Sequence, residues 1–294
     1  MTTDSSRVFS GSEPLKSVLV TGGSGFVGRQ VVRSLLNANV RTEVLCRTSP
    51  KPDQLDARAA VIHVIPDLFS ESFARLQELT SGFDALIHCA WCVDRRDYLS
   101  ATENADCLEG TIRMARAFAV NGGKRFVGIG TCAEYDQSQG ILTTETPLKP
   151  STLYAACKAA TFFTLNGLLP THGVSFAWCR LFYLFGEGER DDRLIPTVRR
   201  NLEQGIPVAL SEGTQVRDFL DVREAGRMIA DVALSAHCGP VNICSERGIT
   251  VRALVEGIAD EYGRRDLLRF GARPMNSFDP PSVVGRRESR IPTA

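Results

Sequence analysis

Tyr154 and Lys158 stand one helical turn apart in a segment with helical periodicity, so they share one face of the predicted helix. A free phenol has a pKa of about 10 and is a poor base at neutral pH. A cation one turn away favours the phenolate and is expected to lower that pKa. The same ammonium can hydrogen-bond the hydroxyls of a ribose. The alternative is an exposed lysine beside a packed tyrosine, and the pair alone does not decide between them.

A third residue, which carries a hydroxyl group, ends the apolar run that precedes this helix. Arg125–Ile129 is a predicted strand, and Thr131 lies two residues beyond its end. The carboxyl ends of parallel strands meet at one edge of a sheet, where ligands bind. We therefore expect Thr131, Tyr154 and Lys158 to lie together at that edge and to form the candidate catalytic group.

Three glycines mark a predicted phosphate-binding turn near the start of the chain. Gly22, Gly25 and Gly28 lie between the apolar run Val18–Val20 and a helical pattern. Gly22 suits a tight turn, Gly25 admits a pyrophosphate, and Gly28 lets the helix pack close to the sheet. The helix N-terminus offers free N–H groups to the anion. Strand, glycines and helix in this order predict a dinucleotide site rather than an ordinary turn. Its expected cofactor contacts are Gly22, Gly25, Phe26 and Val27.

Apolar runs alternate with helical periodicity along the first two thirds of the chain, which predicts an α/β fold with a Rossmann-type doubly wound parallel sheet. The predicted strands are Val18–Val20, Glu43–Cys46, Val61–Ile65, Ala85–Cys89, Arg125–Ile129 and Val174–Leu181. The predicted helices are near Phe26–Asn37, Ser70–Leu79, Tyr98–Val120 and Thr152–Leu169.

After Gly186 the pattern changes to a charged loop and shorter elements, which predicts a small C-terminal substrate-binding lobe. The strand Val216–Leu220 and the helix Val222–Ala233 are expected to return to the main sheet. The predicted division is a flexible tail at 1–15, an NAD(P)-binding Rossmann domain at 16–185 joined by 214–236, and a lobe from 186–213 and 237–294.

The charges of the chain balance, with 34 Lys and Arg residues against 34 Asp and Glu. No global field favours nucleic acid or a membrane surface, and we expect neither as a partner. No apolar run approaches the roughly 18–20 residues that span a bilayer. Because Met1–Glu13 also lacks the apolar region of a secretory signal, we expect a cytoplasmic location.

Nine cysteines are scattered through the predicted elements, and an odd number without clustering favours reduced thiols. Cys89 and Cys92 form a Cys-x-x-Cys pattern, but no second pair or neighbouring histidine completes a zinc site. The four histidines are isolated from one another. We expect no metal site.

With these motifs in place, the chain resembles the extended short-chain dehydrogenase/reductases, the family of nucleotide-sugar epimerases, dehydratases and reductases. The resemblance covers residues 16–262. The matching motifs, in family order, are Thr21–Gly28, Asp67–Leu68, His88–Ala90, Thr131–Tyr135, Tyr154–Lys158 and Arg217–Phe219.

The resemblance implies a role for each matching residue. Thr131 would hydrogen-bond the substrate oxygen, Tyr154 would donate or accept the proton, and Lys158 would hold the cofactor ribose. Arg217 would contact a substrate diphosphate, because a guanidinium suits phosphate oxygens. The further cofactor contacts are Asp67 and Leu68 near adenine and Ala90 near the nicotinamide. The further candidate substrate contacts are Trp91, Cys132 and Tyr183.

The resemblance also implies a homodimer through the helices near Tyr98–Val120 and Thr152–Leu169. Two departures from the family pattern stand out. Cys107 replaces the usual asparagine of the Asn-x-x-Gly-Thr motif, and Tyr183 replaces the asparagine before the Tyr-Gly turn. These changes put an asparagine-dependent proton relay and one substrate contact in doubt, and the closing segment of the family is abbreviated.

The end of the second predicted strand bears on the choice of cofactor. NAD-preferring members carry an acid there, which binds the ribose 2′-hydroxyl. Here Arg47 and Thr48 occupy the position, and both suit a 2′-phosphate. This favours NADP over NAD.

The residues after Thr131 bear on the reaction. Dehydratases of the family place Asp-Glu there, and Cys132-Ala133 supplies neither acid nor base. Glu134, if on a strand, would face the opposite side. Two enzymatic hypotheses remain: NADPH-dependent reduction of a keto group on a nucleotide-linked 6-deoxyhexose, as by a 4-ketoreductase, and epimerisation with a retained NAD(P). A non-catalytic dinucleotide-binding relative is the third, although such proteins usually lose the tyrosine or the lysine.

Overall fold

Seven parallel strands form the centre of the fold, in the order β11-β7-β5-β4-β1-β2-β3. The computed structural model describes residues 15–52, 54–59, 61–93, 97–275 and 279–287. The strands are β1 (Ser17–Thr21), β2 (Arg41–Cys46), β3 (Val61–Val64), β4 (Ala85–His88), β5 (Arg125–Thr131), β7 (Ser175–Leu181) and β11 (Gly239–Ile243). The predicted doubly wound parallel sheet is confirmed.

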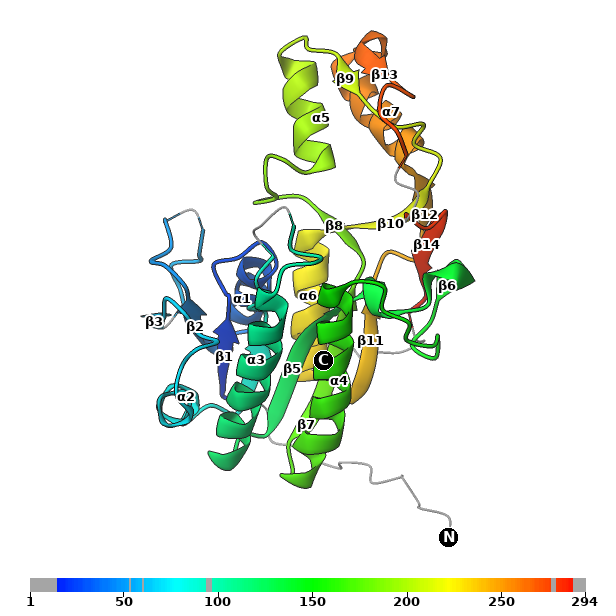
Figure 1. The fold of residues 1–294 in the computed structure, drawn as a ribbon. Helices are drawn as coiled ribbons and strands as arrows, with labels where there is room; N and C mark the ends of the chain where they lie inside the picture. Colours follow the sequence, from blue (N-terminus) through cyan, green and yellow to red (C-terminus); the bar gives the residue numbers. More distant parts are fainter. Residues whose placement is uncertain (1–14, 53, 60, 94–96, 276–278, 288–294) are drawn as a thin grey trace.

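Helices cover both faces of this sheet (Figure 1). Strand residues alternate between the faces, so Val18 and Val20 pack on one side and Leu19 on the other. The first side is covered by α1 (Gly28–Asn37) and α6 (Val222–Leu234). The second side is covered by α2 (Phe73–Thr80), α3 (Glu103–Val120) and α4 (Leu153–Thr171).

A smaller lobe stands above the layered part in Figure 1. Its apolar core joins α5 (Leu194–Glu203) to α7 (Val251–Tyr262). Its short strands are β9 (Val208–Ala209) and β13 (Leu268–Arg269). A second sheet contains β12 (Gly248–Thr250), β10 (Val216–Asp221), β14 (Ser282–Gly285) and β6 (Ile141–Leu142), and β8 (Tyr183–Phe185) pairs with β10. The short 3-10 helices are η1 (Cys132–Glu134), η2 (Gln137–Gln139) and η3 (Arg265–Leu267).

The chain returns to the main sheet twice after the lobe begins. Helix α6 packs against α1, and β11 then extends the sheet beyond β7. The prediction that residues 237–294 belong to the lobe is therefore wrong for β11, which lies in the main sheet. Val241 and Ile243 of β11 are buried in the core shared with α6, which a short apolar run does not reveal by itself. The predicted tail lies, up to residue 14, outside the described residues.

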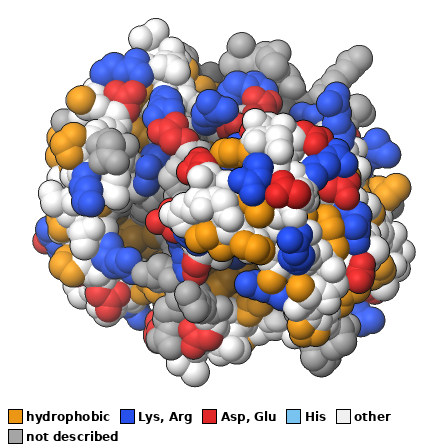
Figure 2. All heavy atoms as spheres, turned by 90° about the horizontal axis from the view of Figure 1, so that it is seen from above, with side chains coloured by type: hydrophobic (Ala, Val, Ile, Leu, Met, Phe, Trp, Pro, Cys, Tyr) orange, Lys and Arg blue, Asp and Glu red, His pale blue; other side chains and the backbone are white. Residues whose placement is uncertain are grey.

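The surface above the sheet carries both signs of charge, intermixed rather than segregated (Figure 2). The nine cysteines all lie within the described residues, and none of them forms a disulfide there. Within the described ranges, none of the helices combines the length and apolar character needed to cross a bilayer. In the same part of the chain, His, Cys, Asp and Glu side chains form no group of three or more that could hold a metal ion.

Candidate active site

The glycine turn connects β1 to α1. Gly22 has a φ of +65°, and its N–H donates to the Leu45 carbonyl of β2 at 2.8 Å. A Cβ on Gly28 would lie 2.2 Å from the Gly22 oxygen, so no larger residue fits there. The first turn of α1 holds no acidic residue, and an anion at this helix end meets no carboxylate from it. The turn, with Gly25, Phe26 and Val27 leading into the helix, therefore fits a dinucleotide pyrophosphate.

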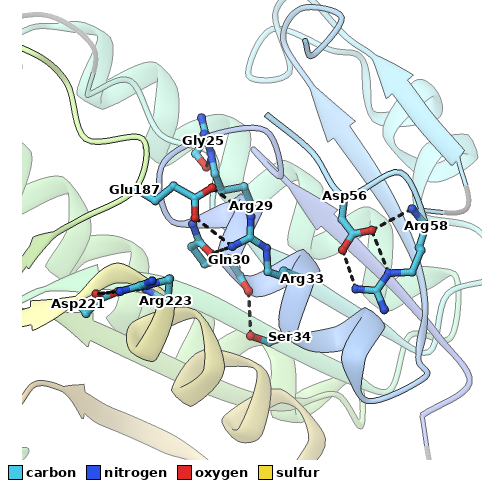
Figure 3. Close-up of polar contacts among 10 residues, drawn as sticks. All are labelled: Gly25, Arg29, Gln30, Arg33, Ser34, Asp56, Arg58, Glu187, Asp221 and Arg223. Atoms are coloured by element: carbon cyan, nitrogen blue, oxygen red, sulfur yellow. Dashed lines mark hydrogen bonds and ion pairs between the residues drawn. The ribbon is translucent and has the colours of Figure 1, made fainter. Parts of the chain in front are cut away.

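The outer side of α1 is tied to the loop that follows β8 (Figure 3). Arg33 pairs with both carboxylate oxygens of Glu187, at 3.0 and 3.1 Å, and this pairing lowers the pKa of Glu187. Arg29 folds back onto the Gly25 carbonyl at 3.3 Å. Further along the same loop, the Arg190 guanidinium donates to the Val93 carbonyl at 3.2 Å. The loop thus connects α1, the helix that follows the glycine turn, to the segment beyond β4.

A buried histidine joins the glycine turn to the end of β4. His88 contacts the Thr21 hydroxyl through Nδ1 at 2.8 Å and the Thr111 hydroxyl through Nε2 at 2.9 Å. The Thr21 oxygen also accepts the Ala90 N–H at 3.2 Å. Burial lowers the pKa of His88 to about 3, so the ring is neutral. These contacts hold the Ala90 backbone beside Gly22. Ala90 is the residue that the sequence predicts to lie near the nicotinamide of the cofactor.

Thr131, Tyr154 and Lys158 converge at the carboxyl end of β5. Thr131 is the last residue of that strand, and the Lys158 ammonium donates to the Ile129 carbonyl at 2.7 Å. Helix α4 begins beside them because the Thr152 hydroxyl caps it, accepting the Ala155 N–H at 3.2 Å. The ammonium lies 6.0 Å from the centre of the Tyr154 ring. The structure brings the predicted catalytic group together.

Burial controls the protonation of this group. It raises the pKa of Tyr154 well above the usual range, with a contribution from Tyr98, and the Thr131 hydroxyl opposes the shift only in part. Burial also lowers the pKa of Lys158 to about 7. The expected lowering of the pKa of Tyr154 is therefore wrong for this structure, because desolvation of the buried phenolate raises that pKa instead. At neutral pH Tyr154 is a phenol with a proton to donate.

The Trp91 ring packs over the Lys158 ammonium. Its ring centre is 3.7 Å from the ammonium, and the ring meets Tyr154 edge-on at 6.5 Å. The indole N–H donates to the side-chain oxygen of Asn104 at 2.8 Å. Asn104 is fully buried and donates to the Tyr98 carbonyl at 2.7 Å, so the indole is held in place. Trp91, a predicted substrate contact, therefore lies against Lys158.

The other predicted substrate residues gather in a second group, beneath the lobe. The Arg217 guanidinium is 5.3 Å from the centre of the Tyr183 ring and 2.5 Å from a carboxylate oxygen of Asp279. Cys132 and Tyr183 share one apolar cluster, and burial raises the pKa of the Cys132 thiol to about 12. A thiol with that pKa is no base at neutral pH. The sequence did not predict Asp279, because no local pattern links it to Arg217.

The residues expected near the adenosine lie at the ends of β2 and β3. Arg47 and Thr48 are exposed directly after β2. Asp67 accepts the N–H groups of Phe69 at 3.2 Å and Ser70 at 3.3 Å, so its side chain shapes the turn before α2. Leu68 packs against the core under this turn.

The prediction that Glu134 lies on a strand is wrong. The residue lies in the 3-10 helix η1, and its carboxylate accepts the Thr131 N–H at 2.8 Å. The Thr131 hydroxyl caps the same turn by accepting the Ala133 N–H at 3.2 Å. The pattern Thr-x-x-Glu is a capping-box sequence and was the available signal.

Taken together, the parallel sheet, the glycine turn and the Tyr154–Lys158 helix define a Rossmann-type dinucleotide-dependent enzyme. Residues 18–244 match the model of the NAD dependent epimerase/dehydratase family. The chain belongs to this family and, with it, to the NAD(P)-dependent enzymes of the extended short-chain dehydrogenase/reductase type.

Individual relatives are distant in sequence and close in fold. The dTDP-6-deoxy-L-talose 4-dehydrogenase (NAD(+)) of Aggregatibacter actinomycetemcomitans is 22% identical, over 92% of this chain and 100% of its own length. A UDP-N-acetylglucosamine 4-epimerase from Methanobrevibacter ruminantium M1, solved with UDP-N-acetylmuramic acid, gives a TM-score of 0.82 at 21% identity, covering 94% of this chain and 90% of its own. A dTDP-glucose 4,6-dehydratase from Streptomyces venezuelae, solved with NAD, gives 0.75 at 24% identity, covering 89% and 93%. A dehydrogenase, an epimerase and a dehydratase thus share the fold, and the choice of reaction rests on the site.

Proposed function

We propose that this protein reduces a keto group of a nucleotide-linked 6-deoxyhexose with NADPH, as a 4-ketoreductase. The observation that carries the proposal is the convergence of Thr131, a protonated Tyr154 and Lys158 at the end of β5. When bound, the nicotinamide dinucleotide supplies a hydride. Tyr154 donates its proton to the substrate oxygen, Thr131 orients that oxygen, and Lys158 holds the ribose.

The residues after Thr131 argue against dehydration. Cys132 keeps its proton, and Ala133 has no acid to offer. The carboxylate of Glu134 already accepts hydrogen bonds from Thr131, Trp178 and Arg180. None of these three positions supplies a base for removing a carbon-bound proton.

Epimerisation with a retained NAD(P) is the second candidate, supported by the structural likeness to an enzyme named as a 4-epimerase. An epimerase needs Tyr154 to accept a proton as well as to donate it, and its raised pKa favours donation. Two incubations with NADPH separate the candidates: one with a dTDP-linked 4-keto-6-deoxyhexose, and one with a dTDP-linked hexose that carries a 4-hydroxyl. Reduction consumes one NADPH for each sugar alcohol formed. Interconversion of sugar nucleotides without net loss of NADPH supports the epimerase, and inertness with both substrate types leaves the non-catalytic alternative.

The proposal of NADP rests on Arg47 and Thr48 at the end of β2, where no carboxylate follows the strand. NAD is the alternative, since the dehydratase structure holds NAD and the talose dehydrogenase is named for NAD(+). We expect Arg47→Asp to weaken NADPH binding by about 10- to 100-fold, because a charge-assisted hydrogen bond to the 2′-phosphate is lost, and to spare NADH. Fluorescence titration with both dinucleotides measures this. Arg75→Asp, at an exposed arginine of α2, is the control. If it weakens NADPH binding equally, or if the parent protein prefers NADH, the assignment of NADP is contradicted.

The ion pair between Arg217 and Asp279 leads to a prediction about substrate affinity. If Arg217 binds the substrate diphosphate, that anion competes with the Asp279 carboxylate for the same guanidinium. Asp279→Asn removes the competitor, and we expect dTDP or UDP to bind about 3- to 10-fold more tightly, as measured by calorimetry. Weaker binding would show instead that Asp279 orients Arg217 for its ligand.

We also propose a homodimer in which α4 meets its copy. The only charged residue of α4 is the buried Lys158, while Phe163 is 62% and Leu153 is 40% exposed. A helix whose exposed face carries no charge and presents large apolar side chains is typical of a buried interface. Phe163→Glu is expected to yield a monomer by sedimentation, and Ile206→Glu, on the lobe, to leave the assembly unchanged. A parent protein that sediments as a monomer contradicts the proposal.

A further inference from the structure

A fully buried carboxylate lies directly behind the catalytic threonine. Glu134 has no exposed surface, and each of its oxygens is hydrogen-bonded. Oε1 accepts the Thr131 N–H at 2.8 Å and the Trp178 indole N–H at 3.0 Å. Oε2 accepts Nε of Arg180 at 2.8 Å. A buried charge costs several kcal/mol unless it is paired and hydrogen-bonded, and this one is both.

The backbone of β5 leaves room for this carboxylate. A Cβ on Gly130 would lie 2.5 Å from Oε1 of Glu134 and 2.2 Å from the indole nitrogen of Trp178. Only glycine at that position lets the carboxylate reach the Thr131 N–H. The arrangement therefore joins three elements, β5, η1 and β7, at the point where the strand ends in the catalytic threonine.

Arg180 balances the charge of Glu134 on the side away from the site. The guanidinium is 1% exposed and lies 4.6 Å from the ring centre of Tyr135 and 4.7 Å from that of Phe162. It also donates to the Tyr135 hydroxyl at 3.0 Å, and that hydroxyl donates to Asn242 at 2.7 Å. Arg180 is thus fixed by aromatic rings and cannot swing toward the substrate.

Lys158 also lies at this strand end, where its ammonium is 5.9 Å from the centre of the Trp178 ring that donates to Glu134. The residue is 4% exposed, and its ammonium donates to the Ile129 carbonyl, two residues before the threonine that Glu134 holds. Burial lowers the pKa of Lys158, and the negative charge of Glu134 is the largest influence that opposes this shift. Around the ammonium, within the described residues, burial keeps Cys89 and His88 at the end of β4 and Tyr154 of α4 uncharged near neutral pH. The hydrogen bond with Cys92, together with burial, raises the pKa of Cys107 of α3, so this thiol is also uncharged.

We propose that Glu134 is a positioning residue for the reaction: it fixes the Thr131 backbone and supplies the buried negative charge that the Lys158 ammonium needs. The inference rests on the proposed function in one respect, because it takes Lys158 to hold the dinucleotide. Glu134 itself touches neither reactant. It acts through Thr131 and Lys158.

Dinucleotide affinity against pH tests this without any sugar substrate. With the parent protein we expect binding to weaken as the pH rises through about 7, the pKa of Lys158, since the protonated form binds more tightly. Glu134→Gln keeps the size and an acceptor oxygen but loses the charge, so this midpoint should fall by about one pH unit. The titration uses whichever of NADPH and NADH binds the parent more tightly, and Lys158→Met should abolish the midpoint.

Two further variants keep the test decisive. Tyr135→Phe disturbs the same buried network without changing a charge, and its midpoint should equal that of the parent. If Glu134→Gln fails to fold, Glu134→Gln combined with Arg180→Met removes both charges of the pair and should still show the lower midpoint. A folded variant with the parental midpoint overturns the role of Glu134. If the proposed keto reduction is wrong, the parent protein will show no turnover of the keto-sugar nucleotide although it still binds the dinucleotide.

Discussion

Replacing Tyr154 by phenylalanine is expected to lower kcat by about 10²- to 10⁴-fold, the usual contribution of a positioned general acid. The ring remains, so its packing against Tyr98 at 5.1 Å and Trp91 at 6.5 Å is kept, and the fold should be unaffected. Only the donated proton is lost. Steady-state kinetics with the keto-sugar nucleotide measure the loss, and fluorescence titration shows whether dinucleotide binding is retained.

Tyr98→Phe is the matched control for this variant. Tyr98 contacts the Tyr154 ring edge-on. Tyr98→Phe also removes one phenolic hydroxyl, but that hydroxyl takes no part in the proposed proton transfer. Its kcat should stay within about threefold of the parent, in line with a small change in packing. If Tyr154→Phe instead turns over as fast as the parent, the proton comes from another group and the assignment of Tyr154 is wrong.

Gly28→Ala is expected to abolish tight dinucleotide binding. The new Cβ would lie 2.2 Å from the Gly22 oxygen and 2.8 Å from the Gly23 Cα, so the turn and the start of α1 must separate. Both clashes involve backbone, which cannot rotate away as a side chain can. We expect a fall in affinity of at least about 10-fold and a stability loss of about 1–3 kcal/mol, the usual cost of overpacking. Dinucleotide titration and chemical denaturation measure the two effects.

Gly257→Ala gives the opposite result and serves as the control. Gly257 lies on the exposed side of α7, with no atom within 4 Å of the added Cβ. Alanine in a helix interior is more stable than glycine by about 0.5–1 kcal/mol, so this variant should be slightly stabilised and bind dinucleotide normally. A Gly28→Ala protein that binds like Gly257→Ala would show that the turn does not hold the pyrophosphate.

The parts of the site that lie in local patterns could be predicted from the sequence. Gly22 and Gly28 stand between a strand and a helix, and Thr131 ends an apolar run. Tyr154 and Lys158 follow the spacing of one helical turn. In each case the local backbone conformation determines where the side chain goes, so the fold class and the members of the proposed catalytic group follow from short segments.

The electrostatics and the long-range pairs could not be predicted in this way. The high pKa of Tyr154 comes from burial among groups of other segments, which spacing alone does not report. The predicted position of Glu134 is wrong because the strand ends at Thr131, where a capped turn begins. Arg217 with Asp279 and Arg33 with Glu187 join distant segments through the tertiary fold. Such contacts depend on packing between elements and carry no local signal.

The central claim is that Tyr154, Thr131 and Lys158 serve the reduction of a sugar ketone by NADPH. The most direct test uses NADPH deuterated on the transferable position of the nicotinamide, a dTDP-linked 4-keto-6-deoxyhexose and mass spectrometry of the product. We predict one deuterium on the former carbonyl carbon, with one NADPH consumed for each sugar alcohol, and product formation at least about 10²-fold slower with Tyr154→Phe. Sugar nucleotides that interconvert without gaining deuterium, or a deuterated product from Tyr154→Phe at the parental rate, would contradict the account.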